Sequence, residues 1–320
     1  MSADAAVHSD LLAAVRAEIA KVIVGQDAVV DGLLVTLIVG GHALVEGVPG
    51  TAKTLLVKTL ATALDLHVRR VQFTPDLMPS DLTGRVIYRQ QSGEFVFHEG
   101  PVFTNVLIGD EINRTPPKTQ AALLEAMQER QVTVEGTARP LPDPFLVVAT
   151  QNPVEYEGTY PLPEAQVDRF LVKLAVDYPD AEQERAMLRR HDERLDAADV
   201  ARMGVTKVVD AAAIRGLRDA AAAVRVDDRI VSYLVDLARA TRSSPSVSLG
   251  ISPRGLVMLL HAAKAWTLLV GRDFVTPDEV QTMALPVWRH RLTLRPEVEL
   301  EGATPDGVLR NLLRSTPVPR

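Results

Sequence analysis

The sequence predicts an α/β fold in its first half, with a parallel sheet covered by helices on both faces, followed by a smaller all-helical domain. Short, continuously apolar runs alternate with helical patterns up to about residue 177, and such runs are typical of strands buried on both faces. One run leads through a Gly/Pro loop directly into a helix. After Asp177 only helical patterns follow, so we expect two domains, residues 1–177 and 178–320.

Five short apolar runs supply the strands of the expected sheet. They are Ala43–Val45, Val68–Phe73, Val106–Ile108, Phe145–Ala149 and a run that begins with Phe170-Leu171-Val172. Before them, residues 10–38 have the spacing of amphipathic helices, with a break at Val24-Gly25-Gln26. Two stretches alternate like β-hairpins: 84–88 faces 94–98 across a Ser-Gly turn, and 131–135 begins the second. We expect both hairpins to be insertions into the α/β core.

Capping signals mark the helices of the second half. A Ser, Thr or Asp side chain before an apolar periodic run accepts hydrogen bonds from the first free N–H groups of a helix. Such residues stand at Asp180, Asp210, Asp227, Ser252 and Thr276. Proline follows Ser252 and Thr276 at the first helical position, where it is favoured. We expect a long helix from Ser252-Pro253 to about Val270 and no strand in this half.

Composition and charge exclude several classes of site. The formal net charge is −6 and 4% of the residues are aromatic, whereas proteins that clamp nucleic acid usually carry a basic field and stacking aromatic side chains. The chain has no cysteine, which excludes disulfides, thiolate catalysis and cysteine-ligated zinc. Residues 1–10 lack a signal-peptide pattern, and the longest uncharged stretch, 32–45, is too short to span a bilayer. We expect a cytoplasmic protein without membrane insertion, for which nucleic acid is an unlikely partner.

A glycine-rich loop between the first strand and the next helix carries the strongest chemical signal. Gly47–Thr54 matches the phosphate-binding pattern G-x-x-x-x-G-K-[ST], except that Ala52 replaces the last glycine. Lys53 at a helix start opposes the helix dipole, but a bound triphosphate reverses the balance, because the ammonium and the free N–H groups then converge on an anion. Thr54 would offer its hydroxyl to Mg²⁺. The alternative is an ordinary Gly/Pro turn with a solvated lysine.

Two adjacent carboxylates end the third apolar run. Asp110 and Glu111 follow Val106–Ile108, and buried charges of this kind are costly without a partner. A Mg²⁺ ion held by Asp110 supplies that partner, and Glu111 can then orient and polarise the attacking water. The alternative is that these acids only cap the following helix. The phosphate loop earlier in the chain favours the metal site.

Three later polar residues are weaker candidates. Asn152 follows the fourth apolar run and could hold a γ-phosphate or a water, although by itself an Asn-Pro turn explains it better. Arg169 could stabilise transition-state charge, often from a neighbouring subunit, or form a surface pair with Asp168. Arg254 lies in the first turn of a predicted helix, where a nearby anion would offset its unfavourable place in the dipole. A solvated arginine is the alternative there.

These motifs, in this order, resemble the MoxR family of AAA+ ATPases. The resemblance covers nearly the whole chain apart from its N-terminal end. The segments that carry it are Gly47–Thr54, Gly109–Arg114, Lys118–Met127, Ala149–Pro153, Glu157–Gln166 and Ser252–Leu256. The fold that it implies is an AAA+ αβα sandwich with a helical lid, with Mg-ATP between the two.

The resemblance also implies a role for each matching residue. Lys53 and Thr54 are similar to the Walker A lysine and threonine, Asp110 and Glu111 to the Walker B pair, Asn152 to sensor 1, Arg169 to the arginine finger and Arg254 to sensor 2. The segment that contains Val24, Gly25 and Gln26 looks like the one that lines the adenine pocket. The two hairpins resemble the helix-2 insertion and the pre-sensor-1 hairpin of this AAA+ branch.

The phosphate loop and the adenine segment together define the expected ATP contacts. These are Val24, Gly25, Gln26, Gly47, Val48, Pro49, Gly50, Thr51, Ala52, Lys53, Thr54 and Leu55, with Mg²⁺ on Thr54 and Asp110. Ala52 departs from the general phosphate loop but is similar to what this family often shows. Gly109 stands where an apolar residue is usual, and we expect looser packing beside the metal.

The activity implied by the resemblance is Mg-dependent ATP hydrolysis that drives chaperone-like remodelling or activation of a protein client. Family members typically form hexameric rings and often act with a protein that carries a von Willebrand factor A domain. Three rival functions remain open: a nucleic-acid-dependent motor, a magnesium-chelatase-like motor subunit, and a nucleotide-gated scaffold that does not hydrolyse ATP. Assays of DNA-stimulated hydrolysis, of metal insertion and of phosphate release separate them.

Overall fold

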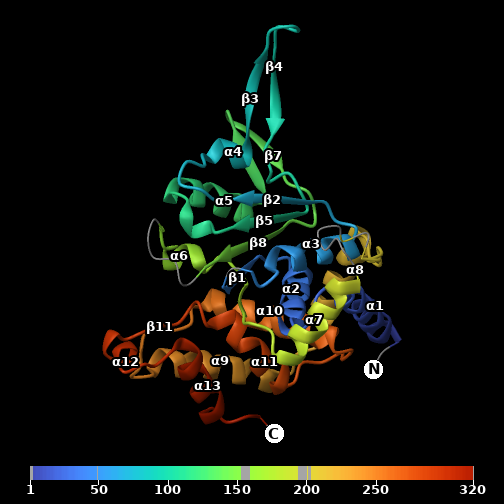
Figure 1. Ribbon diagram of the computed structural model, residues 1–320. Coiled ribbons are helices and arrows are strands. Elements are labelled where there is room, and N and C mark those ends of the chain that lie inside the picture. The colour runs from blue at the N-terminus through green and yellow to red at the C-terminus, as the bar shows by residue number, and fades with distance from the viewer. Residues whose placement is uncertain (1–2, 49, 153–158, 194–199, 201–202, 320) are drawn as a thin grey trace.

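The computed structural model describes residues 3–48, 50–152, 159–193, 200 and 203–319 of the 320-residue chain. Figure 1 shows an α/β body that carries a long hairpin on one side and a helical region on the other. Pro49, Pro153 and residues 157–158, which belong to the motifs above, lie outside the described residues.

A five-stranded parallel sheet forms the centre of the α/β body, as predicted. Its strands, in spatial order, are β2 (Val68–Gln72), β5 (Val106–Asp110), β8 (Leu146–Gln151), β1 (Ala43–Gly47) and β9 (Val172–Val176). All neighbouring pairs are parallel. In such a sheet every strand ends at the same edge, which is where ligands bind in open α/β folds.

The apolar runs are continuous because both faces of the sheet are buried. Alternate residues of a strand point to opposite faces, so in β5 Val106 and Ile108 join one core cluster while Leu107 joins the other. The same division holds in β8, where Val148 and Ala149 belong to different clusters. Helices α1 (Ala3–Ala20), α2 (Asp27–Val39) and α3 (Lys53–Ala63) contribute to the first cluster, and α5 (Pro117–Glu129) contributes to the second.

Both predicted hairpins are present. Strands β3 (Gly84–Arg89) and β4 (Glu94–Glu99) follow the short helix α4 (Pro79–Thr83), and β6 (Gln131–Val134) pairs with β7 (Thr137–Pro140). Gly84 opens the first hairpin with φ +91, and an added Cβ would lie 2.3 Å from the carbonyl oxygen of His98. Near its tip Tyr88 and Phe95 are paired across the strands, 52% and 74% exposed. This hairpin projects well beyond the α/β body (Figure 1).

The second half is mostly helical. Its helices are α7 (Ala181–Glu193), α8 (Ala211–Ala223), α9 (Asp228–Ser243), α10 (Pro253–Leu269), α11 (Pro277–Trp288), α12 (Pro296–Leu300) and α13 (Pro305–Ser315). The expectation of helices alone is wrong, because β10 (Val247–Leu249) pairs with β11 (Thr293–Leu294). Strands of two and three residues are too short to show a periodic pattern in the sequence. None of the described helices is long and apolar enough to span a membrane.

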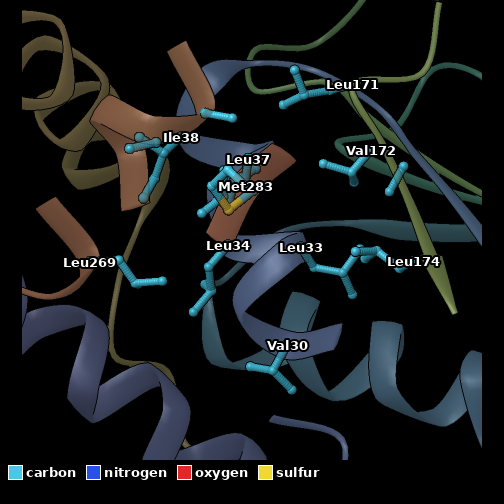
Figure 2. Close-up of a cluster of buried hydrophobic side chains, with 14 of the residues drawn as sticks. Val30, Leu33, Leu34, Leu37, Ile38, Leu171, Val172, Leu174, Leu269 and Met283 are labelled. Atoms are coloured by element: carbon cyan, nitrogen blue, oxygen red, sulfur yellow. The ribbon is translucent and has the colours of Figure 1, made fainter. Parts of the chain in front are cut away.

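Helix α2 is buried on almost every side, which corrects the prediction of an amphipathic helix. Figure 2 shows why: Leu33 and Leu34 lie among Leu174 of β9, on the sheet, and Leu269 and Met283 of the second half. A helix enclosed in this way has no face left for polar residues. The buried cluster therefore crosses residue 177, and the division into domains 1–177 and 178–320 stays a prediction.

A buried histidine at the start of β1 makes the fold sensitive to acid. The Nδ1 atom of His42 accepts a hydrogen bond from the Val147 N–H (3.0 Å), so Nε2 carries the proton and donates it to the Met127 carbonyl (3.1 Å). Burial lowers the pKa of His42 from 6.5 to about 4. Between pH 6.5 and pH 4, His42 is therefore protonated in the unfolded chain and neutral in the folded chain.

We expect His42 to contribute stability that is complete above pH 6.5 and lost as the pH falls towards 4. The difference in pKa corresponds to about 3 kcal/mol. In urea unfolding at each pH, the stability of the wild type relative to His42→Gln should fall by that amount between pH 7 and 4. The variant His67→Gln, at an exposed histidine, is the control and should follow the wild type. A constant difference between wild type and His42→Gln would contradict this role of the neutral imidazole.

Candidate functional site

The loop between β1 and α3 lies at the carboxyl edge of the sheet. Gly47 allows β9 to approach, since an added Cβ would lie 2.5 Å from the carbonyl oxygen of Val176. Gly50 has φ +83 with open space around it, and Ala52 has φ +58. The position where the strict pattern has glycine is thus left-handed, a conformation that costs a non-glycine residue about 1–2 kcal/mol. The sequence departs from the pattern at Ala52, but the backbone does not.

Lys53 is a partly buried cation whose hydrogen bonds go to neutral groups. Its Nζ donates to the carbonyl oxygens of Gly47 and Val48, each at 2.7 Å. Burial lowers the pKa of Lys53, while the charges of Asp110 and Glu111 oppose that shift. Helix α3 has no acidic residue of its own in its first turn, so its positive end and the ammonium lie together. This arrangement favours a phosphate.

The two predicted metal ligands, Thr54 and Asp110, lie close together. Asp110 Oδ2 is 3.4 Å from the Thr54 hydroxyl and accepts a hydrogen bond from Arg70 Nε at 2.6 Å. Its Oδ1 accepts from the Thr150 hydroxyl at 3.2 Å. Asp110 is buried and Arg70 is about half exposed, so the guanidinium neutralises the carboxylate from the solvent side. A metal ion that binds Oδ2 of Asp110 would have to share this oxygen with Arg70 or displace the Arg70 side chain.

The oxygen donors fit Mg²⁺ bound together with a phosphate ligand. Mg²⁺ usually binds through one or two carboxylates, waters and substrate phosphates, not through a cage made only of protein. Thr54 and Asp110 offer such a sparse, oxygen-only set. Within the ranges that the structure describes, no three His, Asp or Glu side chains gather to hold a metal.

Glu111 has a constrained backbone and a tethered carboxylate. Its φ is +58, and its N–H donates to the Thr150 hydroxyl at 3.0 Å. Its Oε2 accepts from Gln72 Nε2 at 2.6 Å and lies 3.3 Å from Arg114 Nε. The short helix η1 (Ile112–Arg114) starts directly after it. Strained residues of this kind cost on the order of 1–3 kcal/mol and cluster at active sites.

A cavity of about 380 Å³ joins these groups. This volume is within the range of small-molecule sites. Buried Asn152, directly after β8, is among the residues that line the cavity. The residues that line the cavity are Gly47, Gly50, Thr51, Ala52, Lys53, Thr54, Leu55, Arg70, Gln72, Asp110, Glu111, Thr150, Gln151 and Asn152. The described residues of the phosphate loop, apart from Val48, thus meet the two carboxylates and Asn152 in one place.

The predicted adenine segment lies near this cavity but does not line it. Gln26 Nε2 donates to the carbonyl oxygen of Asp177 at 3.3 Å. Gly25 has the side chain of Gln183 directly over it, since an added Cβ would lie 2.2 Å from Gln183 Cδ. Gln26 and Gly25 therefore contact the chain that follows β9 and the start of α7, and Val24 is not among the described residues that line the cavity either.

Arg169 and Arg254 lie at the opposite edge of the sheet. Strand β9 runs parallel to β1, with Val172 opposite Ala43 and Val176 opposite Gly47. Arg169 precedes β9, so the length of a strand, about 13 Å at 3.3 Å per residue, separates it from the phosphate loop. Arg254 Nε is 3.7 Å from Asp168 Oδ2, which places Arg254 at the same edge.

The expected position of Mg-ATP between the α/β body and the helical lid stays a prediction. No lid residue is among the described residues that line the cavity. Helix α10 packs against α2, α8 and α1. The surface pair of Asp168 with Arg169 is also not formed, because Asp168 pairs with Arg291 and Arg254, and Arg169 Nε donates to Gln128.

Four residues of the cavity were missed by sequence reasoning. Arg70 and Gln72 lie two residues apart on β2 and so share one face, and Thr150 and Gln151 are the last two residues of β8. Polar residues at alternate positions of a strand beside the Asp110 strand were the available signal. The loose packing expected at Gly109 is also absent, since a Cβ there would lie 3.0 Å from the ring of Phe73, which is fully buried.

Comparison with known proteins agrees with this geometry. Residues 42–172 match the model of the ATPase family associated with various cellular activities, and residues 239–312 match the AAA lid domain. The chaperone MoxR1 of Mycobacterium tuberculosis is 43% identical over 317 residues, which cover 95% of this chain and 81% of MoxR1. The chain belongs to the MoxR family of AAA+ ATPases.

Two further proteins match the chain over nearly its whole length. YeaC of Bacillus subtilis is 45% identical over 299 residues, 93% of this chain and 92% of YeaC. A candidate ATPase from Cytophaga hutchinsonii, with a crystal structure at 2.00 Å, superposes with a TM-score of 0.90 at 40% identity, covering 99% of this chain and 97% of that one. The AAA+ fold with a lid is therefore common to this MoxR-family ATPase and a solved relative.

Proposed function

We propose that this MoxR-family ATPase binds Mg-ATP in the cavity at the carboxyl edge and uses its hydrolysis, as a chaperone, to remodel or activate a protein partner. One observation carries the proposal. Lys53, Thr54, Asp110, Glu111 and Asn152 come from three separate strand ends and line one cavity. A cation, two oxygen ligands for a metal, a carboxylate for water and an amide are the groups that phosphoryl transfer to water needs.

Each residue has a distinct task in this proposal. Lys53, now bound to two carbonyl oxygens, turns its ammonium to the β- and γ-phosphates, and the first N–H groups of α3 hold the same phosphates. Thr54 and Asp110 would hold Mg²⁺, which neutralises phosphate charge when bound. Glu111 accepts the proton of the attacking water, and Asn152 orients that water or the γ-phosphate.

Arg169 and Arg254 support a ring in which each subunit completes its neighbour's site. Both lie at the edge of the sheet away from their own cavity. An arginine so placed reaches a γ-phosphate only if another subunit presents its carboxyl edge to it. A head-to-tail contact of this kind closes into a ring, and the hexamer expected of the family is the assembly that we propose.

Two observations support a chaperone role and a protein partner. The M. tuberculosis relative is named a chaperone, and the long hairpin presents Tyr88 and Phe95 to solvent. We propose a protein client, with a von Willebrand factor A domain protein as an associated partner and the cytoplasm as the location. A nucleic-acid-dependent motor and a chelatase-like subunit remain the rivals that client capture would exclude.

Calorimetry of ATP with Mg²⁺ tests the central site. The wild type should bind, and Lys53→Ala should bind about a hundredfold more weakly, because it loses charged hydrogen bonds to phosphate worth roughly 3 kcal/mol. Lys58→Ala removes a lysine from the same helix outside the cavity and should bind like the wild type. Folded wild-type protein without ATP affinity, or equal affinities in all three proteins, would refute the proposed site.

A further inference from the structure

A buried arginine joins the lid to the segment that carries Arg169. Arg291 follows α11, and its side chain is 2% exposed. Burial lowers its pKa to about 10, with Asp168 opposing the shift, so the guanidinium stays charged at neutral pH. A buried charge needs a full set of partners, and the partners of Arg291 come largely from one short segment.

That segment is 168–171, immediately before β9. Arg291 Nε donates to Asp168 Oδ1 at 2.7 Å, and Nη2 donates to the carbonyl oxygens of Asp168 (2.9 Å) and Phe170 (2.5 Å). Nη1 donates to the carbonyl oxygen of Leu171 at 3.1 Å. One planar guanidinium thus binds the backbone on either side of Arg169 and the carboxylate of the residue before it. A lysine ammonium has fewer donors, and they lack the planar geometry of a guanidinium, so it could not make the same contacts.

The same arginine is held against the first turn of α10. An added Cβ on Gly255 would lie 3.1 Å from Arg291 Cδ, so the residue after Arg254 has to be small for Arg291 to pass. Trp288, buried at the end of α11, donates from Nε1 to the carbonyl oxygen of Gly255 at 2.9 Å. The starts of α10 and β9 and the end of α11 therefore meet around one guanidinium.

Asp168 is shared between the buried arginine and an exposed one. Its Oδ1 binds Arg291, and its Oδ2 lies 3.7 Å from Nε of Arg254, which is 49% exposed. The first contact is short and buried, whereas the second is long and open to solvent. A phosphate could therefore draw Arg254 away while Asp168 stays with Arg291. Without the carboxylate charge, the two guanidinium groups would repel each other.

We propose that Asp168, anchored by Arg291, is the positioning residue that holds Arg169 and Arg254 as a pair for the nucleotide site of the neighbouring subunit. This inference rests on the proposed function, in which both arginines act in trans. Asp168 is covalently next to Arg169 and electrostatically paired with Arg254. It therefore sets the spacing of the two cations, and a shift of about 1 Å in such groups can lower a rate about a hundredfold.

The variant Asp168→Asn tests the inference with little change in volume. Arg291 keeps an acceptor at Oδ1, but Arg254 loses its counter-charge. We expect ATP affinity within about twofold of wild type and turnover lowered at least tenfold, as misplaced catalytic groups imply. Asp306→Asn is the matched control: its carboxylate binds Arg289 at 2.8 Å in the same lid and is 28% exposed, against 26% for Asp168. It should retain wild-type turnover.

Mixed oligomers show in which subunit the defect acts. Asp168→Asn subunits have an intact nucleotide cavity, and Lys53→Ala subunits have intact arginines. Mixed assemblies, verified by native mass spectrometry, should regain turnover, because a Lys53→Ala subunit supplies well-placed arginines to an Asp168→Asn neighbour. A residue that only stabilised its own subunit would lower its thermal midpoint and ATP affinity and would gain nothing from such a neighbour.

The mixture of Arg169→Ala with Lys53→Ala separates two kinds of failure. If that mixture regains turnover and the Asp168→Asn mixture does not, the arrangement in trans holds and the positioning role of Asp168 is refuted. If neither mixture recovers, completion of the site by a neighbour fails, and the inference fails with it. Wild-type turnover of Asp168→Asn, or loss of its ATP affinity, also overturns the inference.

Discussion

Glu111→Gln should bind ATP like the wild type and hydrolyse it about a thousandfold more slowly. The amide keeps the shape of the side chain and can occupy the same left-handed backbone, but it cannot accept the proton of an attacking water. General-base groups contribute on the order of 10²–10⁴ in rate. Phosphate release under saturating Mg-ATP, with ATP affinity measured separately by calorimetry, checks both halves of the expectation.

The control for this variant is Glu125→Gln, at an exposed glutamate of α5. It makes the same chemical change in the same α/β body and should retain wild-type turnover. The carboxylate of Glu111 also contacts Gln72 and Arg114, so it could have a structural task instead. If that were its only task, Glu111→Gln would lower the thermal stability, and the protein that stays folded would keep wild-type turnover. Wild-type turnover in Glu111→Gln would remove Glu111 from the water-activating role.

Local physics made several elements predictable from sequence. Asp210, Asp227 and Ser252 each accept a backbone N–H of the helix that they precede, and a cap of this kind involves only residues two or three apart. The strands were equally accessible, because burial on both faces leaves an uninterrupted apolar run. The cavity followed from these elements, since Lys53 follows β1 and Asp110 ends β5, and the carboxyl ends of parallel strands lie at the same edge of the sheet.

The position of the lid depends on contacts that no local pattern encodes. Helix α2 has apolar side chains all round, which does not tell which segments of the chain surround it. The structure places Leu269 and Met283, both from the helical second half, against α2 (Figure 2). Arg291 is the clearest case, since its partners Asp168, Phe170 and Leu171 stand more than a hundred residues earlier in the chain. In the sequence it is one basic residue among 35.

The same long-range packing decides which subunit Arg169 serves. A finger arginine contributes about 10³–10⁵ to phosphoryl transfer, so Arg169→Ala should lower turnover at least a thousandfold and leave ATP affinity nearly unchanged. Its side chain donates only to Gln128 among the described contacts, and its removal leaves the Arg291 network intact. Arg215→Ala, at an exposed arginine of α8, is the matched control and should behave like the wild type.

The parallel pairing of β9 with β1 makes this effect directional. Arg169 stands before Val172, and the phosphate loop follows Gly47, which pairs with Val176 at the other end of β9. An arginine at that distance from its own cavity cannot reach a phosphate there without taking β9 out of the sheet. Arg169→Ala subunits should therefore be rescued by Lys53→Ala neighbours and not by further Arg169→Ala subunits. Activity in isolated wild-type monomers equal to that of the assembly would show that no neighbour is needed.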